Sequence, residues 1–189
     1  MEKKIGFIGC GNMGQAMLKG MLDSKLFKAD MIIASTTLRS YEKLQEKLNI
    51  NVVTNNLDVT DFADILILSV KPDKFKSVIN EIKTHVKNTT VLVSIAGGIN
   101  IRQIEEMFGA NIKVVRAMPN TSAVVRESMS VLCKNKFVTD EELKTVFSIF
   151  DSFGKTELIE EKLIDAVASV SGSSPAYVYM FIEAMADAS

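Results

Sequence analysis

Short continuous runs of apolar residues alternate along the chain with stretches in which apolar residues recur every three or four positions. A short continuous run is typical of a strand covered on both faces of a sheet, and the second spacing is typical of an amphipathic helix. The runs predict strands at residues 5–9, 31–35, 51–54, 64–70, 90–95, 113–118, 129–133 and 156–159. The second spacing predicts helices at residues 13–22, 41–48, 75–86, 101–108 and 139–150. This alternation predicts an α/β fold, a Rossmann-like, doubly wound and mostly parallel sheet with helices on both faces.

The end of the chain has a different pattern. Residues 160–169 have helical spacing, and the Ser-Gly-Ser-Ser-Pro sequence that ends at Pro175 is expected to break this helix. A second helix is expected over residues 176–189, with Pro175 in its first turn and Ser173 or Ser174 as its N-cap. This second helix is apolar on most faces, so it should be buried on several sides.

We therefore expect two domains. Residues 1–160 form the sheet domain, and residues 161–189 form the first helices of a helical domain that the chain leaves incomplete. The alternative is a C-terminal helix that docks on the sheet domain or on a partner chain.

Composition narrows the class of protein. The 189 residues carry a formal net charge of −1, from 22 Lys and Arg against 23 Asp and Glu, and 47% of them are hydrophobic. The hydrophobic fraction is ample for a packed core, and near-neutral charge argues against a nucleic-acid binder. No apolar run approaches the roughly 20 residues of a membrane span. Because Met1 leads directly into the first strand, we expect no signal peptide and a cytoplasmic protein.

The two cysteines and the single histidine restrict the possible chemistry. They are too few for a disulfide framework, for a cysteine-based zinc site, or for most histidine-dependent metal sites. A Ser-His-Asp site is also weakened. We expect no metal.

The first strand leads into a helix through Gly9-Cys-Gly-Asn-Met-Gly14. This G-x-G-x-x-G spacing is weak evidence alone, but between a strand and a helix it indicates a dinucleotide site. Gly9 would allow the tight turn, Gly11 the approach of the pyrophosphate, and Gly14 close helix–strand packing. Asn12 and Met13 open the helix, whose free N–H groups would hold the phosphates. The alternative is a glycine turn that only packs.

The end of the second strand predicts which dinucleotide binds. A carboxylate about 20 residues beyond the glycines would hold the ribose 2′-hydroxyl of NAD. Ala-Ser-Thr-Thr-Leu-Arg occupies residues 34–39 here, without an acid. Hydroxyl groups and a guanidinium suit a 2′-phosphate. We therefore expect NADPH, with NADH as a weaker substitute, bound through Ser35, Thr36 and Arg39; the alternative is an ordinary polar loop.

Four further segments follow predicted strands and would lie at the same edge of the sheet. They are Asn55-Asn56, Val70-Lys-Pro72, Ala96-Gly-Gly98 and Met118-Pro-Asn120-Thr121. Adjacent glycines let the backbone pass close to a flat ring, and proline stiffens the exit from a strand. Each segment could equally be turn chemistry, but together they outline one crevice.

Several of these motifs together resemble pyrroline-5-carboxylate reductases. The resemblance lies in Phe7-Ile-Gly-Cys-Gly-Asn-Met-Gly14, Val70-Lys-Pro72, Ala96-Gly-Gly-Ile99, Arg116-Ala-Met-Pro-Asn-Thr121, Val124-Val-Arg-Glu127, residues 165–177 and residues 182–187. It covers the whole chain, and the Ser-Gly-Ser-x-Pro-Ala-Tyr junction is its most specific part. One departure is Ser174, where the family usually has glycine.

The resemblance implies hydride transfer from NADPH to the imine carbon of 1-pyrroline-5-carboxylate, which gives L-proline. It implies that Val70, Lys71 and Pro72 border the nicotinamide ribose. It further implies that Ala96, Gly97, Gly98 and Asn120 lie near the nicotinamide ring and that Asn56 approaches the adenosine ribose. The all-helical second domain of the family builds homodimers and larger homo-oligomers.

Family members continue well beyond the length of this chain. The further part holds a Ser-Pro-Gly-Gly-Thr-Thr-like loop for the substrate carboxylate and a threonine near the imine. The resemblance therefore leaves the catalytic residues unassigned in this chain and implies that a fragment of this length can be inactive. A protonated imine is already a good electrophile, so little acid catalysis is needed.

Two side chains and two protein classes remain as alternatives. Lys71 could be a general acid, although a solvated side chain is favoured. Cys10 could be activated near the helix N-terminus, although a small loop residue is favoured. A β-hydroxyacid dehydrogenase would carry its lysine inside the long helix after the sheet domain, whereas Lys162 precedes the Ser-Gly-Ser-Ser-Pro sequence. The last alternative is a non-catalytic NADP-binding module.

Overall fold

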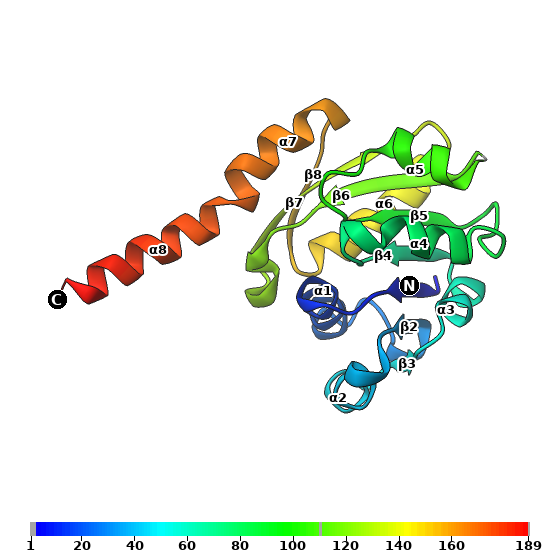
Figure 1. Ribbon diagram of the computed structural model, residues 1–189, viewed down its shortest axis with the longest axis horizontal. Helices are drawn as coiled ribbons and strands as arrows, with labels where there is room; N and C mark the ends of the chain where they lie inside the picture. Colours follow the sequence, from blue (N-terminus) through cyan, green and yellow to red (C-terminus); the bar gives the residue numbers. More distant parts are fainter. Residues whose placement is uncertain (1–2, 110, 189) are drawn as a thin grey trace.

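The computed structural model describes residues 3–109 and 111–188, so Met1, Glu2 and Ala110 of the expected sheet domain and Ser189 of the expected C-terminal helix lie outside the described residues. Within this part of the chain the strands form one sheet in the order β3-β2-β1-β4-β5-β6-β7-β8 (Figure 1). The strands are β1 (Ile5–Ile8), β2 (Ile32–Ser35), β3 (Asn51–Val53), β4 (Ile65–Leu68), β5 (Val91–Ser94), β6 (Lys113–Met118), β7 (Ser128–Lys134) and β8 (Gly154–Leu158). The first six strands run parallel, β7 pairs antiparallel with β6, and β8 pairs parallel with β7. The predicted Rossmann-like α/β fold is confirmed.

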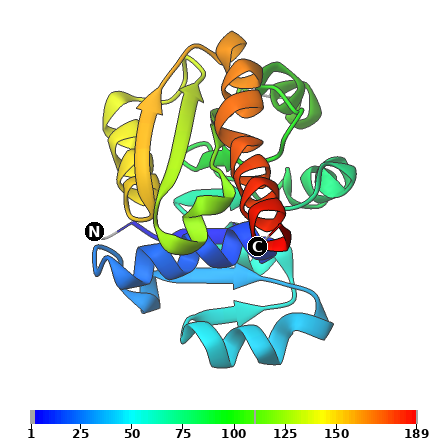
Figure 2. The ribbon, with the colours of Figure 1, turned by 90° about the vertical axis from the view of Figure 1, so that its left-hand side faces the viewer.

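Helices cover both faces of the sheet (Figures 1 and 2). They are α1 (Asn12–Asp23), α2 (Leu38–Leu48), α3 (Asn56–Phe62), α4 (Pro72–Ile82), α5 (Ile101–Phe108), α6 (Asp140–Asp151), α7 (Ile164–Val167) and α8 (Ser174–Asp187), with short turns η1 (Ala29–Met31), η2 (Thr121–Val125), η3 (Glu161–Leu163) and η4 (Ala168–Gly172). Successive residues of a strand point to opposite faces. Ile65 and Ile67 therefore pack with α1, α2 and α6, whereas Leu66 and Leu68 pack with α3, α4 and α5.

Helices α1, α5 and α6 begin within one residue of their predicted starts, whereas α2 and α4 begin three residues earlier, and one helix was missed. The Thr139–Glu142 capping box opens α6 as predicted. The missed helix is α3, because Asn55-Asn56 was predicted only as a short loop after a strand. It forms because the Asn55 side chain accepts a hydrogen bond from the Leu57 N–H and so caps a helix of seven residues.

The predicted break in the C-terminal helix is wrong. Instead of a loop, η4 is a π-helical turn that joins α7 to α8 with Ser173 as the one intervening residue. The serine hydroxyls do not cap α8: Ser173 Oγ donates to the Ala168 carbonyl, and Ser174 Oγ donates to the Val170 carbonyl. These bonds run back along the helix, so the chain stays helical. Pro175 lies in the first turn of α8 as predicted.

Helix α8 projects away from the sheet (Figure 1). None of the described residues of this helix is buried, and its exposed apolar side chains include Tyr179, Met180 and Phe181. The alternative of a helix docked on the sheet domain is therefore wrong for this chain.

The described residues lack two features of other classes of protein. No helix among them is both long enough and apolar enough to cross a membrane. They also contain no group of three or more His, Cys, Asp and Glu side chains that could hold a metal ion.

Candidate functional site

The carboxyl ends of six parallel strands meet along one edge of the sheet, and every predicted cofactor-binding residue lies at or just after one of these ends. They follow β1 (Gly9, Gly11, Asn12, Met13, Gly14), β2 (Ser35, Thr36, Arg39), β3 (Asn56), β4 (Val70, Lys71, Pro72), β5 (Ala96, Gly97, Gly98) and β6 (Asn120). The strand order reverses at β1, with β2 and β3 on one side and β4 to β6 on the other. Open α/β sheets bind ligands in the crevice outside such a reversal.

The three glycines of the first loop have different steric surroundings. Gly9 has a φ of +88°, and a Cβ there would lie 2.7 Å from the Ser69 carbonyl oxygen. A Cβ on Gly14 would lie 3.0 Å from both the Gly9 carbonyl oxygen and Ser69 Oγ. At Gly11, no described atom lies within 4 Å of the Cβ position. Gly9 therefore permits the turn, Gly14 permits the close packing of α1, and Gly11 keeps open space above the loop.

The N-terminus of α1 faces this open space. Gly11 is its N-cap, no described side chain caps it, and its first turn, all of it described, has no acidic residue. The first N–H groups of the helix are consequently free for an anion, which the helix dipole also favours. Gln15 Nε2 donates to the Cys10 carbonyl oxygen at 2.9 Å and so helps to fix the glycine loop.

The Cys10 side chain is part of the core and not of the open space. Its exposed fraction is 6%. Burial raises the pKa of its thiol to about 12, so the thiolate is scarce at neutral pH. The prediction of a small loop residue agrees with this placement.

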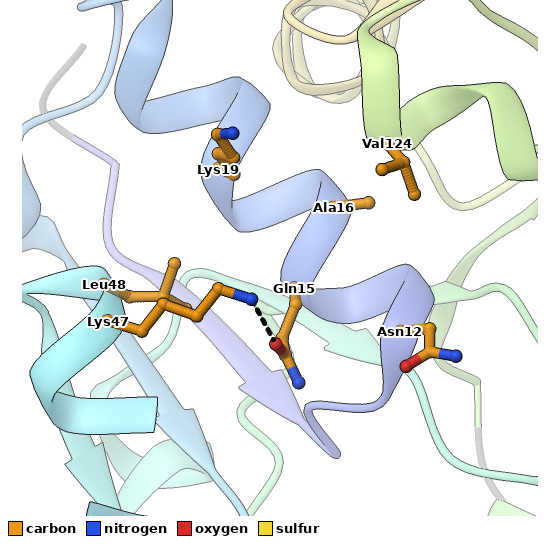
Figure 3. Close-up of a pocket in the computed structure, with 7 residues that line it drawn as sticks. All are labelled: Asn12, Gln15, Ala16, Lys19, Lys47, Leu48 and Val124. Carbon is orange, nitrogen blue, oxygen red and sulfur yellow. Dashed lines mark hydrogen bonds between the residues drawn. The ribbon is translucent and has the colours of Figure 1, made fainter. Parts of the chain in front are cut away.

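A pocket of about 270 Å³ lies beside the glycine loop. It is lined by Asn12, Gln15, Ala16, Lys19, Lys47, Leu48 and Val124, which come from α1, α2 and η2 (Figure 3). Lys47 Nζ reaches across from α2 and donates to Gln15 Oε1 at 3.2 Å. With Lys19 it gives this side of the loop positive charge.

The residues after β2 divide into one buried and two accessible groups. Ser35 is 2% exposed, and its hydroxyl donates to Asn56 Oδ1 at 2.7 Å. Thr36 is half-buried and Arg39 is exposed in the first turn of α2. No described side chain caps α2 at Thr37. An anion at this point would meet Thr36, Arg39 and free helical N–H groups, whereas Ser35 would act through Asn56.

Asn56 is the first residue of α3, and its side chain bridges two other elements. Its Oδ1 accepts from Ser35, and its Nδ2 donates to Glu81 Oε2 at 2.9 Å. The Asn56 carbonyl oxygen accepts from Thr60 Oγ1 at 2.8 Å. Its position beside the end of β2 agrees with the expected place near an adenosine ribose, and that contact stays a prediction.

The next two segments are arranged as strand exits with accessible backbone. Pro72 is the first residue of α4 and Lys71 is its N-cap, both exposed, while Val70 is half-buried against Gly9. After β5, Gly97 and Gly98 are exposed, with a φ of +76° at Gly98 and no described atom within 4 Å of either Cβ position. A flat ring could therefore approach this backbone closely.

Asn120 has its side chain committed to protein contacts. Its Nδ2 donates to the Ser171 carbonyl oxygen in η4 at 3.0 Å, and its Oδ1 accepts from the Met129 N–H at 3.3 Å. A pocket of about 410 Å³ lies beside it, bounded by η4 and the start of α8. Its expected contact with a nicotinamide ring stays a prediction; its observed role is to tie the end of β6 to the helical segment.

Sequence reasoning missed Gln15, Lys47 and Glu81. Each takes part in a hydrogen bond between elements that are distant in the sequence, Lys47 with Gln15 and Glu81 with Asn56. Spacing along the chain carries no signal for such pairs.

The comparisons with known proteins cover both parts of the chain. The family model described as NADP oxidoreductase coenzyme F420-dependent matches residues 4–98, and the model described as pyrroline-5-carboxylate reductase dimerisation matches residues 161–189. The pyrroline-5-carboxylate reductase of Escherichia coli is 42% identical over 189 residues, which are 100% of this chain and 70% of that protein. The corresponding protein of Methanosarcina acetivorans is 39% identical, over 98% of this chain and 69% of that protein.

A solved structure agrees with these relatives. The pyrroline carboxylate reductase of Plasmodium falciparum, crystallised with NADP bound, superposes with a TM-score of 0.91 at 37% identity. The superposition covers 100% of this chain and 70% of that one.

Proposed function

The chain belongs to the pyrroline-5-carboxylate reductase family, and we propose that it reduces 1-pyrroline-5-carboxylate to L-proline with NADPH, with NADH as a weaker substitute. The observation that carries the proposal is the uncapped N-terminus of α1 beneath the open space at Gly11. The chain spans about 70% of the length of the E. coli relative.

The residues at the strand ends fit a dinucleotide with a 2′-phosphate. The pyrophosphate is held by the first N–H groups of α1. The 2′-phosphate is held by Thr36, Arg39 and the start of α2, where the segment from Ser35 to Arg39 has no acid to repel it. Lys19 and Lys47 add positive charge beside the loop.

The adenosine lies between Asn56 and a pocket of about 340 Å³ that has both apolar and polar walls. The pocket is lined by Leu38, Tyr41, Val52, Val53, Thr54 and Asp58. Its apolar walls suit the faces of a purine ring, and Asn56 meets the ribose.

NADPH supplies the hydride when it is bound. Val70, Lys71 and Pro72 border the nicotinamide ribose, and the open backbone of Gly97 and Gly98 leaves one ring face accessible. The chain's own contribution is orientation, because holding the reacting carbon about 3–3.5 Å from the hydride gives a high effective concentration. Lys71 remains solvated and takes no part in proton transfer.

The rest of the proposed site lies on the helical side. Residues 161–189 form the start of a helical dimerisation domain after a sheet domain of residues 1–160, and the boundary falls between β8 and η3. The exposed apolar side chains of α8 suit an interface in a homodimer or a larger homo-oligomer. The protein acts in the cytoplasm on a small molecule, without nucleic acid or membrane partners.

The experiment is to add the chain to NADPH and 1-pyrroline-5-carboxylate and to follow absorbance at the NADPH band, with product identified by mass spectrometry as proline. The same assay is run on the chain extended to the length of its relatives. Imine-dependent oxidation of NADPH by the extended protein supports the proposal. Binding of NADPH without reduction by that protein would assign a non-catalytic NADP-binding module.

A further inference from the structure

Three side chains from separate elements form one hydrogen-bonded chain beside the end of β2. Ser35 Oγ donates to Asn56 Oδ1 at 2.7 Å, and Asn56 Nδ2 donates to Glu81 Oε2 at 2.9 Å. Ser35 ends β2, Asn56 begins α3, and Glu81 lies in the last turn of α4, which packs against α3. These two hydrogen bonds thus tie the end of β2 to two helices on one face of the sheet.

Only one of the three side chains, that of Glu81, fixes which end of the Asn56 amide faces Ser35. A serine hydroxyl both donates and accepts, so Ser35 would be satisfied by either end of the Asn56 amide. A carboxylate has no proton to donate at neutral pH, so Glu81 can bond only to the Nδ2 group. The Oδ1 atom is then turned toward Ser35. Without Glu81, the two amide orientations would be nearly equivalent.

The environment of Glu81 supports this role. Its side chain is exposed, and among the described residues it forms no salt bridge, although Lys83 follows two residues later. Its described hydrogen-bond partner is a neutral amide and not a cation. The Asn56 backbone is fixed independently, because Thr60 Oγ1 donates to its carbonyl oxygen. The amide orientation is therefore the feature of Asn56 that Glu81 adds.

We propose that Glu81 is a positioning residue of the dinucleotide site, which fixes the Asn56 amide in the orientation that meets the adenosine ribose. This inference rests on the proposed function, since it takes Asn56 as the ribose contact. With one Nδ2 hydrogen held by Glu81 and one Oδ1 lone pair held by Ser35, Asn56 keeps one donor and one acceptor for ribose hydroxyls. Fixing them before binding removes part of the ordering cost of association.

The test measures dissociation constants of this chain for NADPH and for adenosine 2′,5′-bisphosphate, a probe of the adenosine end alone. Glu81→Leu should raise both constants about three- to tenfold, the range expected when binding must order one side chain. Glu81→Gln should restore binding to within about twofold, because its amide oxygen can accept from Asn56. Glu106→Leu is the matched control, since this exposed glutamate bonds to Arg102 on α5.

A double-mutant cycle separates positioning from a structural or charge effect. In an Asn56→Ala background, Glu81→Leu should leave the dissociation constants for both probes unchanged. In either background, Glu81→Leu should also leave the melting temperature unchanged. Equal affinities of wild type and Glu81→Leu would overturn the inference and leave the proposed function intact. An effect that persists without Asn56 would overturn it as well. Failure of the wild-type chain to bind either probe would refute the proposed cofactor site itself.

Discussion

Gly11 is the position in the glycine loop where an added methyl group should separate binding from folding. Its φ of −71° and ψ of −169° suit any L-residue, and no described atom lies within 4 Å of the Cβ position. Alanine is a poorer N-cap than glycine by about 0.5–1 kcal/mol. In a chain of this size that difference lowers the melting temperature by about 1–4 °C. Gly11→Ala should therefore fold almost normally.

In the proposed site, the same methyl group occupies the space through which the pyrophosphate would approach α1. Losing one charge-assisted hydrogen bond costs about 1.5–3 kcal/mol. That loss raises the dissociation constant for NADPH about 10- to 150-fold. The expected phenotype is a large loss of affinity with little loss of stability.

The two neighbouring glycines give the contrasting phenotype. At Gly9, a left-handed backbone costs an L-residue about 1–2 kcal/mol, and the 2.7 Å approach to the Ser69 carbonyl oxygen adds an overlap. At Gly14, the added Cβ would press against the Gly9 carbonyl oxygen and Ser69 Oγ. Alanine at either position should lower the melting temperature more than Gly11→Ala does.

The assay combines thermal denaturation with titration of NADPH fluorescence for each variant. Gly172→Ala is the matched control, because its Cβ would make ordinary contacts, 3.7 Å from Met118 Cε at the end of β6 and 3.9 Å from Ala168 Cβ in η4. It should leave the dissociation constant unchanged. If Gly11→Ala binds NADPH within twofold of the wild type, the pyrophosphate does not pass over Gly11 and the placement on α1 is refuted.

Three further predictions concern charge and protonation. Arg39→Ala should lower the preference for NADPH over NADH about fivefold, as expected for one exposed charged contact of about 1 kcal/mol; equal loss of both cofactors in the titration would contradict the 2′-phosphate assignment. Burial raises the pKa of the Glu142 carboxyl, but hydrogen bonds from Lys113 and Thr139 outweigh burial, so its pKa lies below the ordinary 4.5. A lowered folded pKa stabilises the fold above pH 4.5 and ceases to do so as the pH falls through the folded value. Glu142→Gln should thus cost about 1 kcal/mol at pH 7 and less below pH 4.5, and a melting-temperature difference independent of pH would refute this. Cys10, with a thiol pKa near 12 against an ordinary 9.0, should react with iodoacetamide at pH 8 about 1,000-fold more slowly than free cysteine, as measured by mass spectrometry; rapid labelling of the folded chain would show that the thiol is not buried.

The sheet could be predicted because its central strands are covered on both faces. Such strands are continuous apolar runs, and β4 (Ile65–Leu68) and β5 (Val91–Ser94) are buried at every residue. The glycine loop was equally visible, since the steric demands at Gly9 and Gly14 are local to a strand-to-helix turn. Local demands leave their mark on neighbouring residues, and so they can be read from the sequence.

The C-terminal helix shows where local signals mislead. Serine and proline after Gly172 were read as a break because serine often caps helices. The hydroxyls of Ser173 and Ser174 instead donate to carbonyl oxygens on the preceding turn. Helix α3 shows the opposite error, because a helix formed where none was predicted. It is too short to show periodicity. Its signal was Asn55 followed three residues later by Asp58, whose carboxylate accepts a hydrogen bond from the Asn55 side chain.

The site was predicted as an edge and not as a set of side-chain roles. Parallel strands bring their carboxyl ends together whatever their side chains, so the candidate residues share one edge. Which of them face a ligand depends on packing between elements. Ser35 was predicted as a phosphate contact but is buried against Asn56, and nothing in the order of residues after β2 distinguishes it from the accessible Thr36.

The polar contacts of β6 explain how a helix without buried residues can still leave the sheet in a defined direction. The Arg116 side chain is buried. Its Nη1 lies 3.2 Å from Glu161 Oε1, and its Nη2 lies 3.6 Å from Asp165 Oδ1. Four residues along the same strand exit, Asn120 holds the Ser171 carbonyl oxygen of η4. A buried guanidinium is costly unless it is paired, so both partners are drawn to it. Arg116 on β6 and Asn120, two residues after the end of β6, thus hold η3, α7 and η4 in place. The strand that ends at the proposed cofactor crevice therefore also sets the direction in which α8 presents its apolar side chains.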